Sequence, residues 1–153
     1  MTGGRLKAIR SYLNEDEPFC FTYGDGVADI DIGELIQFHR RHGKACTITA
    51  VAPPGRFGAL EFKGDLVTDF REKPAGDGGR INGGFFVGAT SVLDHIEGPD
   101  TTWENEPLET LAKSEQLVAF QHDGFWHSVD TLRDKTFLEE LWATGRAPWK
   151  VWG

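Results

Sequence analysis

Residues 18–26 read PFCFTYGDG, an apolar and aromatic run that stops abruptly at Gly24, Asp25 and Gly26. The run has the length and composition of a β-strand. A strand that ends in Gly-Asp-Gly places a carboxylate at its C-terminal end, which is the edge where open α/β sheets bind ligands. The flanking glycines allow a ligand to approach closely. A tight turn in which Asp25 caps the next element is the alternative interpretation.

Helical and strand patterns alternate on both sides of this run. We expect further strands over residues 45–51, 59–62, 66–70, 81–87, 117–122 and 125–129. We expect helices over residues 5–13, 31–43, 91–96, 106–113 and 131–143. Asp31, with Glu34 three residues later, has the form of a helix N-cap, and Gly64-Asp65 indicates a hairpin turn. The pattern predicts an α/β fold with a mixed sheet.

Composition restricts the class of protein. The 153 residues carry a formal net charge of -8, which disfavours a binder of duplex nucleic acid because such proteins need a basic face. The length predicts a single domain. Cys20 and Cys46 both lie in apolar, strand-like runs, so we expect both to be buried rather than disulfide-bonded. No apolar run approaches the roughly 20 residues of a membrane helix, and we expect a cytoplasmic protein without a membrane partner.

Two further segments combine a strand with polar or basic residues. Glycines inside the strand that contains Asn82-Gly83-Gly84 imply close approach of a ligand or of another backbone, and Asn82 could bind a sugar hydroxyl. A β-bulge is the alternative. In Glu72-Lys73-Pro74 the lysine could hold a phosphate as a point charge, although a solvated charge run has the same appearance.

A second carboxylate follows another strand. The run 125–129 ends at Asp130, at the mouth of the last predicted helix. Asp130 is either the N-cap of that helix or, together with Asp25, a ligand of Mg²⁺, which commonly takes one or two carboxylates and keeps waters and substrate phosphates. Asp29-Ile30-Asp31 has the Asp-x-Asp form of metal-dependent glycosyltransferases, with Asp31 as a helix cap as the competing interpretation.

Taken in order, the motifs resemble those of one family. They are Tyr23-Gly24-Asp25-Gly26-Val27-Ala28-Asp29, Pro53-Pro54-Gly55-Arg56-Phe57-Gly58, Glu72-Lys73-Pro74, Asn82-Gly83-Gly84-Phe85-Phe86, Trp103-Glu104, Glu106-Pro107-Leu108, Asp130-Thr131-Leu132-Arg133-Asp134-Lys135 and Ala147-Pro148-Trp149-Lys150-Val151-Trp152. The set resembles the glucose-1-phosphate cytidylyltransferases, within the sugar-nucleotide pyrophosphorylase family, over essentially the whole chain. The resemblance implies a Rossmann-like, GT-A-like nucleotidyltransferase fold.

The resemblance also implies an activity: CTP and α-D-glucose 1-phosphate would give CDP-glucose and pyrophosphate, for deoxysugar and surface polysaccharide biosynthesis. By the same resemblance, Asp25 and Asp130 bind Mg²⁺ and Lys73 holds the sugar phosphate. The residues implied to line the substrate site are Glu72, Asn82, Gly83, Tyr23 and Gly24. Catalysis would then depend on positioning and on the charge of the metal, without a protein nucleophile.

The chain departs from the family pattern in two places. Members begin with a strand and a Gly-x-Gly-Thr-Arg-type loop that holds the triphosphate and reads the base, and no such segment is present, so we expect residues 1–153 to be the C-terminal portion of one nucleotidyltransferase domain. His127-Ser128-Val129 stands where the family usually has Gln-Pro-Met. The missing half predicts a homo-oligomer or marginal stability, because sheet edge and core would be uncovered. A non-catalytic sugar-phosphate-binding or oligomerisation fragment remains the alternative function.

Overall fold

The computed structural model describes residues 1–53, 59–63, 66–71 and 79–152. The chain divides into two compact units. The first unit comprises Met1–Tyr23, Asp31–Thr49 and Gly84–Phe120, and the second comprises Gly24–Ile30, Ala50–Gly83 and Gln121–Gly153.

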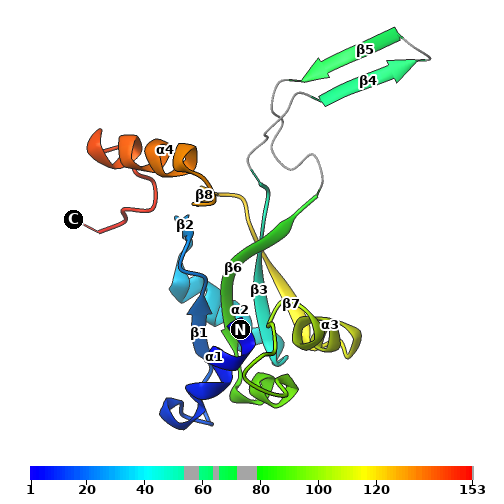
Figure 1. Cartoon of the computed structure of the whole chain (residues 1–153), viewed down its shortest axis with the longest axis vertical. Helices are drawn as coiled ribbons and strands as arrows, with labels where there is room; N and C mark the ends of the chain where they lie inside the picture. The colour runs from blue at the N-terminus through cyan, green and yellow to red at the C-terminus, as the bar shows by residue number, and fades with distance from the viewer. Residues whose placement is uncertain (54–58, 64–65, 72–78, 153) are drawn as a thin grey trace. The chain divides into compact units, whose positions relative to one another are not determined.

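The largest sheet has four strands in the order β1-β6-β3-β7 (Figure 1). These strands are β1 (Phe19–Thr22), β6 (Ile81–Gly88), β3 (Cys46–Val51) and β7 (Leu117–His122). β1 pairs antiparallel with β6, from Phe19 opposite Gly88 to Thr22 opposite Phe85. The sheet and the helices between its strands confirm the predicted α/β class with a mixed sheet.

The helices of the first unit are α1 (Thr2–Ala8), α2 (Ile32–His42) and α3 (Glu106–Lys113), with 3₁₀ helices η1 (Arg10–Tyr12) and η2 (Thr90–His95). The expected single helix over 5–13 is wrong, because the α-helix begins at Thr2 and ends at Ala8. Its start is set by backbone contact: Gly4 N–H donates to Thr101 O at 3.2 Å, and a Cβ on Gly4 would lie 2.1 Å from Pro99 O.

One hydrophobic core fills the first unit. Its buried members are Cys46, Phe86, Val92, Leu93, Ile96, Trp103, Leu108 and Leu111. The Trp103 ring is 1% exposed and lies edge-on to Phe21 and Phe86, with centroid distances of 5.3 and 6.0 Å. Rings in such edge-to-face contact contribute beyond the area that they bury.

The two cysteines have different surroundings. Cys46 is fully buried in the core, as predicted, and burial raises the pKa of its thiol to about 12. The expectation that Cys20 is buried is wrong, because this side chain is exposed. β1 is an edge strand whose side chains alternate in burial, so Phe19 and Phe21 pack on the core while Cys20 faces outward.

Among its described residues, the second unit contains two short antiparallel strand pairs and the helix α4, besides the ends of three strands of the larger sheet. β2 (Gly26–Ala28) pairs with β8 (Trp126–Ser128), and β4 (Ala59–Lys63) pairs with β5 (Leu66–Arg71) as predicted for a hairpin. The turn at Gly64-Asp65 lies outside the described residues. The helix α4 spans Leu132–Ala143. Among the residues that the structure describes, no helix has the length and apolar character needed to cross a membrane.

The ends of the longer strands are tied together in the second unit by Arg80. Its guanidinium donates to Ala50 O at 3.3 Å and to His122 O at 3.1 Å, and it pairs with Asp123. The Arg80 side chain, from the residue before β6, therefore links the end of β3 to the end of β7, since the guanidinium has several donors in a fixed geometry.

Candidate metal and substrate site

The two aspartates predicted to bind a metal lie at the same end of the β2–β8 pair. The strands run antiparallel with Gly26 opposite Ser128, so the start of β2 lies beside the end of β8. Beyond this pair, Val129 N–H donates to Asp25 O at 2.7 Å. Asp25 and Asp130 are both exposed. The structure therefore brings the two residues to one exposed edge of the second unit.

The start of α4 does not use Asp130 as its cap. Thr131 is the N-cap, and its hydroxyl accepts from Asp134 N–H while Asp134 Oδ2 accepts from Thr131 N–H at 2.9 Å. This reciprocal pair is a capping box. Hydrogen bonds from Thr131, together with nearby His127, hold the pKa of Asp134 below its usual value despite some desolvation. Asp130 instead accepts a hydrogen bond at Oδ2 from Ser128 Oγ, at 2.8 Å.

The donor set at this edge fits one kind of metal. Among the described residues, no group of three or more His, Cys, Asp or Glu side chains is placed to hold a metal ion. A closed zinc site needs about four such ligands. Two exposed carboxylates fit Mg²⁺, which is commonly held by one or two carboxylates and completes its shell with water and substrate phosphates.

β8 joins this edge to the predicted Asn82-Gly83 segment. Trp126 Nε1–H donates to Gly83 O at 2.8 Å. This role of Trp126 was not predicted from the sequence. The available signal was its indole N–H, which needs a hydrogen-bond acceptor when the ring is buried. Gly83 and the neighbouring Asn82 are therefore fastened to the strand that ends at Ser128, within the second unit.

Gly84, the next residue, belongs to the first unit and has a different structural role. Gly84 has φ 79°, and a Cβ there would lie 2.6 Å from Tyr23 Cδ2. Tyr23 N–H also donates to Gly84 O at 3.1 Å. The close approach predicted from the glycines is therefore, at Gly84, an approach of the Tyr23 ring.

Tyr23 and Gly24 differ in their surroundings. The Tyr23 ring packs edge-on to Phe86 with a centroid distance of 5.6 Å. Burial raises the pKa of Glu104, but hydrogen bonds from Thr2 and Tyr23 outweigh it and leave that pKa below its usual value. Gly24 is exposed, and a Cβ there would meet nothing within 4 Å. The position next to Asp25 is thus open to solvent.

The remaining predicted residues are either undescribed or used elsewhere. Glu72 and Lys73 lie outside the described residues. Asp31 is the N-cap of α2 and accepts from Glu34 N–H at 2.9 Å, which confirms the cap interpretation. Asp29 Oδ1 lies 2.9 Å from His122 Nε2. Asp31, one of the two Asp-x-Asp carboxylates of the glycosyltransferase alternative, thus has a local structural role.

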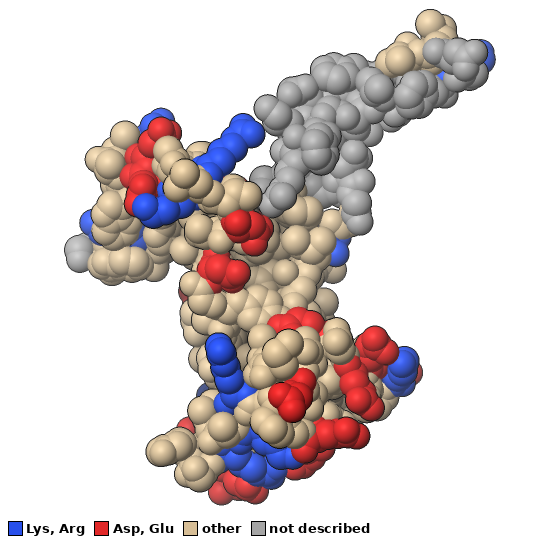
Figure 2. All heavy atoms as spheres, viewed as in Figure 1, with Lys and Arg blue, Asp and Glu red and all other residues tan. Residues whose placement is uncertain are grey.

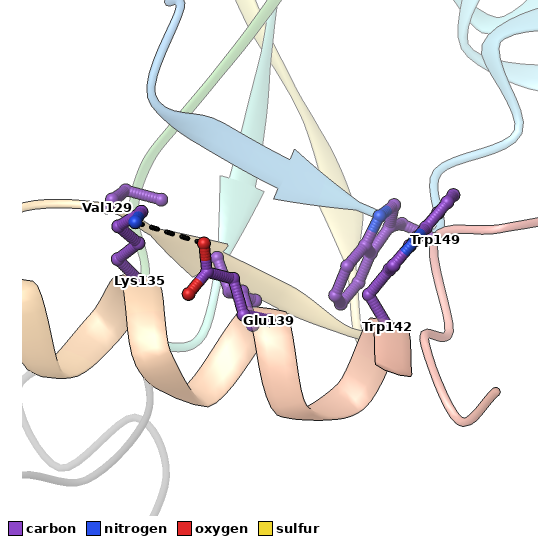
Figure 3. A pocket seen from close by; sticks show the side chains of 6 residues that line it. Val129, Lys135, Glu139, Trp142 and Trp149 are labelled. Atoms are coloured by element: carbon purple, nitrogen blue, oxygen red, sulfur yellow. Dashed lines mark ion pairs between the residues drawn. The ribbon is translucent and has the colours of Figure 1, made fainter. Parts of the chain in front are cut away.

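The side of β8 that faces α4 is occupied by apolar packing. His127 stacks at a tilt on Phe137, with centroids 5.1 Å apart. Further along, a pocket of about 380 Å³ is open at the surface (Figure 3). Its lining residues are Val129, Lys135, Leu138, Glu139, Trp142 and Trp149. In Figure 3 the two tryptophans lie at one end and the Lys135–Glu139 ion pair, at 3.0 Å, at the other.

Comparison with known proteins assigns the family. Residues 3–138 match the family described as nucleotidyl transferase. The chain belongs to the nucleotidyl transferase family. The fold of the chain resembles that of the solved structure of HddC from Yersinia pseudotuberculosis, with which it aligns at a TM-score of 0.65 and 22% identity, over 92% of this chain and 62% of that one.

Two curated relatives of this nucleotidyl transferase differ in similarity. The chain is 60% identical over 152 residues to the glucose-1-phosphate cytidylyltransferase of Salmonella typhimurium, covering 99% of this chain and 59% of that protein. It is 33% identical over 145 residues to the mannose-1-phosphate guanylyltransferase catalytic subunit beta of Dictyostelium discoideum, covering 92% of this chain and 40% of that protein. The chain thus spans about three-fifths of the length of the Salmonella relative.

Proposed function

We propose that the chain belongs to an enzyme that transfers a cytidylyl group from CTP to α-D-glucose 1-phosphate, giving CDP-glucose and pyrophosphate. The observation that supports this proposal is the 60% identity to the Salmonella glucose-1-phosphate cytidylyltransferase along nearly the whole chain. The identity to a mannose-1-phosphate guanylyltransferase is only 33%. Sequence similarity therefore favours cytidylyl transfer to glucose 1-phosphate over guanylyl transfer to mannose 1-phosphate.

The proposed reaction sets a clear electrostatic problem. An oxygen of the sugar phosphate forms a bond to the α-phosphorus of CTP, and the bond from that phosphorus to the departing pyrophosphate breaks. Both reactants are anions, so their approach needs positive charge between them. Mg²⁺, held by Asp25 and Asp130, would neutralise phosphate charge and orient the reacting groups. Both aspartates lie at the exposed end of the β2–β8 pair, where phosphates can reach them.

The other proposed residues position the substrates. Lys73 would hold the sugar phosphate as a point charge, with Glu72 and Asn82 near the sugar. Asn82 and Gly83 would form the wall that Trp126 fastens to β8. Tyr23 and Gly24 would border the same substrates, with Gly24 leaving space that a side chain would fill. Positioning of this kind, without a covalent intermediate, is how phosphoryl-type transfers are usually accelerated.

The experiment is a pyrophosphate-release assay with CTP, glucose 1-phosphate and Mg²⁺. It is run on the chain and on a chimaera in which the chain replaces its matched part of the Salmonella relative. We expect the chimaera to turn over, and to prefer this pair of substrates over GTP with mannose 1-phosphate. A chimaera that folds but releases no pyrophosphate from CTP would overturn the proposal.

A second candidate function is a non-catalytic module that binds sugar phosphate or other subunits. The observation that favours it is the exposure of large apolar side chains on α4, such as Leu132 and Trp142, which could bind another subunit. Calorimetry on the chain separates the two: binding of glucose 1-phosphate without CTP supports the module, and binding of CTP with Mg²⁺ supports the enzyme. The glycosyltransferase is not proposed, because Asp31 is used as a helix cap.

We extend the proposal to partners, location and pathway. Large apolar side chains are exposed on α4 and the following tail, which supports a homo-oligomer. They include Leu132, Phe137, Trp142, Val151 and Trp152.

Both cysteines are free, which is usual in a reducing compartment, and we propose a cytoplasmic location. On the visible face of the described residues, acidic and basic side chains lie in small groups without an extended basic surface (Figure 2), which supports substrates other than nucleic acid. The family resemblance supports a role in deoxysugar and surface polysaccharide biosynthesis.

A further inference from the structure

Ser128 makes a contact that none of the sequence motifs anticipates. Its hydroxyl donates to Asp130 Oδ2 at 2.8 Å. An exposed aspartate ordinarily samples several rotamers. Here the donor belongs to the last residue of β8, which is held in register by its pairing opposite Gly26. The orientation of an exposed carboxylate is thus tied to a strand rather than left to solvent.

The alternation of side chains along β8 explains why this hydroxyl reaches Asp130. Successive residues of an extended chain point to opposite faces, and residues two apart share a face. His127 packs on Phe137 of α4, and Val129 lines a pocket whose wall is formed largely by α4. Ser128 and Asp130 therefore share the other face. Across the pair, the residue opposite Ser128 is Gly26, which has no side chain to compete for the hydroxyl.

The chemistry of the pair suits a metal ligand. A hydroxyl that donates to an ionised carboxylate makes a charge-assisted hydrogen bond, which is stronger than a neutral one. Because Oδ2 accepts from a hydroxyl on β8, this hydrogen bond restrains the orientation of the carboxylate before any cation arrives. Partners of this kind, which hold a ligand in place without touching the metal, commonly change metal affinity by about 10- to 100-fold when they are removed.

We propose that Ser128 is a positioning residue, which orients Asp130 for binding a divalent cation. The inference rests on the proposed Mg²⁺ site. It goes beyond that site, because it assigns a role to a residue that is not itself proposed to touch the metal or the substrates. The observation that carries it is the hydrogen bond from the Ser128 hydroxyl to Asp130 Oδ2.

The test is a direct measurement of cation binding. Mn²⁺ is titrated into the chain, and free Mn²⁺ is followed by electron paramagnetic resonance. We expect Ser128→Ala to weaken binding by about 10-fold without a change in the thermal unfolding midpoint, and Ser128→Thr, which keeps the hydroxyl, to restore it to within about twofold. Thr144→Ala is the matched control, because its hydroxyl donates to Glu140 O within α4 and is remote in sequence from the site.

The outcomes separate this inference from the proposed site. If the chain does not bind Mn²⁺, or if Asp130→Asn binds it as well as the unchanged chain, the metal site itself is wrong and the inference falls with it. If Asp130→Asn weakens binding and Ser128→Ala does not, the metal site stands and the role of Ser128 is overturned. Equal weakening by Ser128→Ala and Ser128→Thr also overturns it, because the hydroxyl would then not be the active group.

Discussion

The two units of the chain differ in where their apolar side chains lie. The first unit buries a continuous core around Trp103, Phe86 and Leu111, each at most 1% exposed. In the second unit, the buried hydrophobic side chains among the described residues are Ile30, Val51 and Leu138. Its α4 and the tail that follows expose large apolar residues instead, such as Trp142 at 52%. Burial of apolar surface is the main favourable term in folding, so the first unit should dominate stability.

The residues proposed for chemistry follow the opposite distribution. Asp25 and Asp130 are exposed and belong to the second unit. Substituting an exposed side chain away from a core or a cap usually changes stability by no more than about 0.5 kcal/mol. Core substitutions in the first unit should therefore lower the free energy of unfolding. Substitutions of Asp25 or Asp130 in the second unit should instead lower cation binding and turnover.

The largest expected effect is in the core of the first unit. Trp103→Ala should lower the free energy of unfolding by about 3–5 kcal/mol, because it leaves a large cavity beside Phe21 and Phe86. Urea denaturation followed by circular dichroism measures this change. Trp142→Ala in the second unit is the matched control, with an expected cost below about 1 kcal/mol. Equal costs for the two tryptophans would contradict the division of stability between the units.

The next effect is at the exposed carboxylates. Asp25→Asn and Asp130→Asn should each lower the rate of pyrophosphate release in the active chimaera by about 10²–10³-fold, as expected when a charge-stabilising group is removed. The urea midpoint should stay unchanged, because both side chains are exposed. Asp123→Asn, which alters an exposed carboxylate of the same unit paired with Arg80, is the control. Near-normal turnover in either metal-site variant would refute the assignment.

Local patterns predicted the elements whose boundaries depend on nearby residues. The helix over 106–113 and the strand over 117–122 have the predicted bounds. The first has a proline at its start, where the missing N–H costs nothing. The cap at Asp31 was also predictable, because it depends on a side chain three residues from its partner.

The predictions failed where distant contacts decide. Cys20 is exposed because β1 lies at the edge of the sheet, and strand order is not encoded in the local run. α1 begins at Thr2 because its glycines meet the backbone near Pro99, almost a hundred residues away. At the site, the local pattern predicted that Asp25 and Asp130 act together, because each aspartate follows a predicted strand. It did not predict that Ser128 would bond to Asp130, since that contact requires the strand to bring both to one face.

A smaller effect is expected where Gly84 meets Tyr23. Gly84→Ala should destabilise the chain by about 1–3 kcal/mol, because the new methyl would lie 2.6 Å from Tyr23 Cδ2 at a positive φ. Gly24→Ala is the matched control, because a Cβ at this position would meet nothing within 4 Å. It should cost less than about 1 kcal/mol. Chemical denaturation of both variants provides the comparison. A Gly84→Ala variant as stable as Gly24→Ala would show that the ring moves aside freely.

The smallest effect concerns pH and a polar cluster in the first unit. Thr47 Oγ1 lies 2.9 Å from His39 Nδ1 and 2.7 Å from His42 Nε2, and Lys44 N–H donates to His42 Nδ1 at 2.9 Å. His39 and Thr47 are buried. Because His42 Nδ1 accepts the Lys44 proton, the neutral ring fits this arrangement and the protonated ring does not.

Burial is the main cause that lowers the pKa of both histidines, with His42 and Arg40 adding to it at His39 and Lys44 at His42. An unfolded histidine has a pKa of about 6.5. A folded pKa below that value means that the unfolded chain binds more protons as pH falls, so stability is full above about pH 6.5 and declines below it. Urea midpoints at pH 7.5, 6.5 and 5.5 should fall in that order, and His42→Gln should reduce the slope. A midpoint that holds constant or rises toward pH 5.5 would show that these histidines do not govern the pH dependence of the first unit.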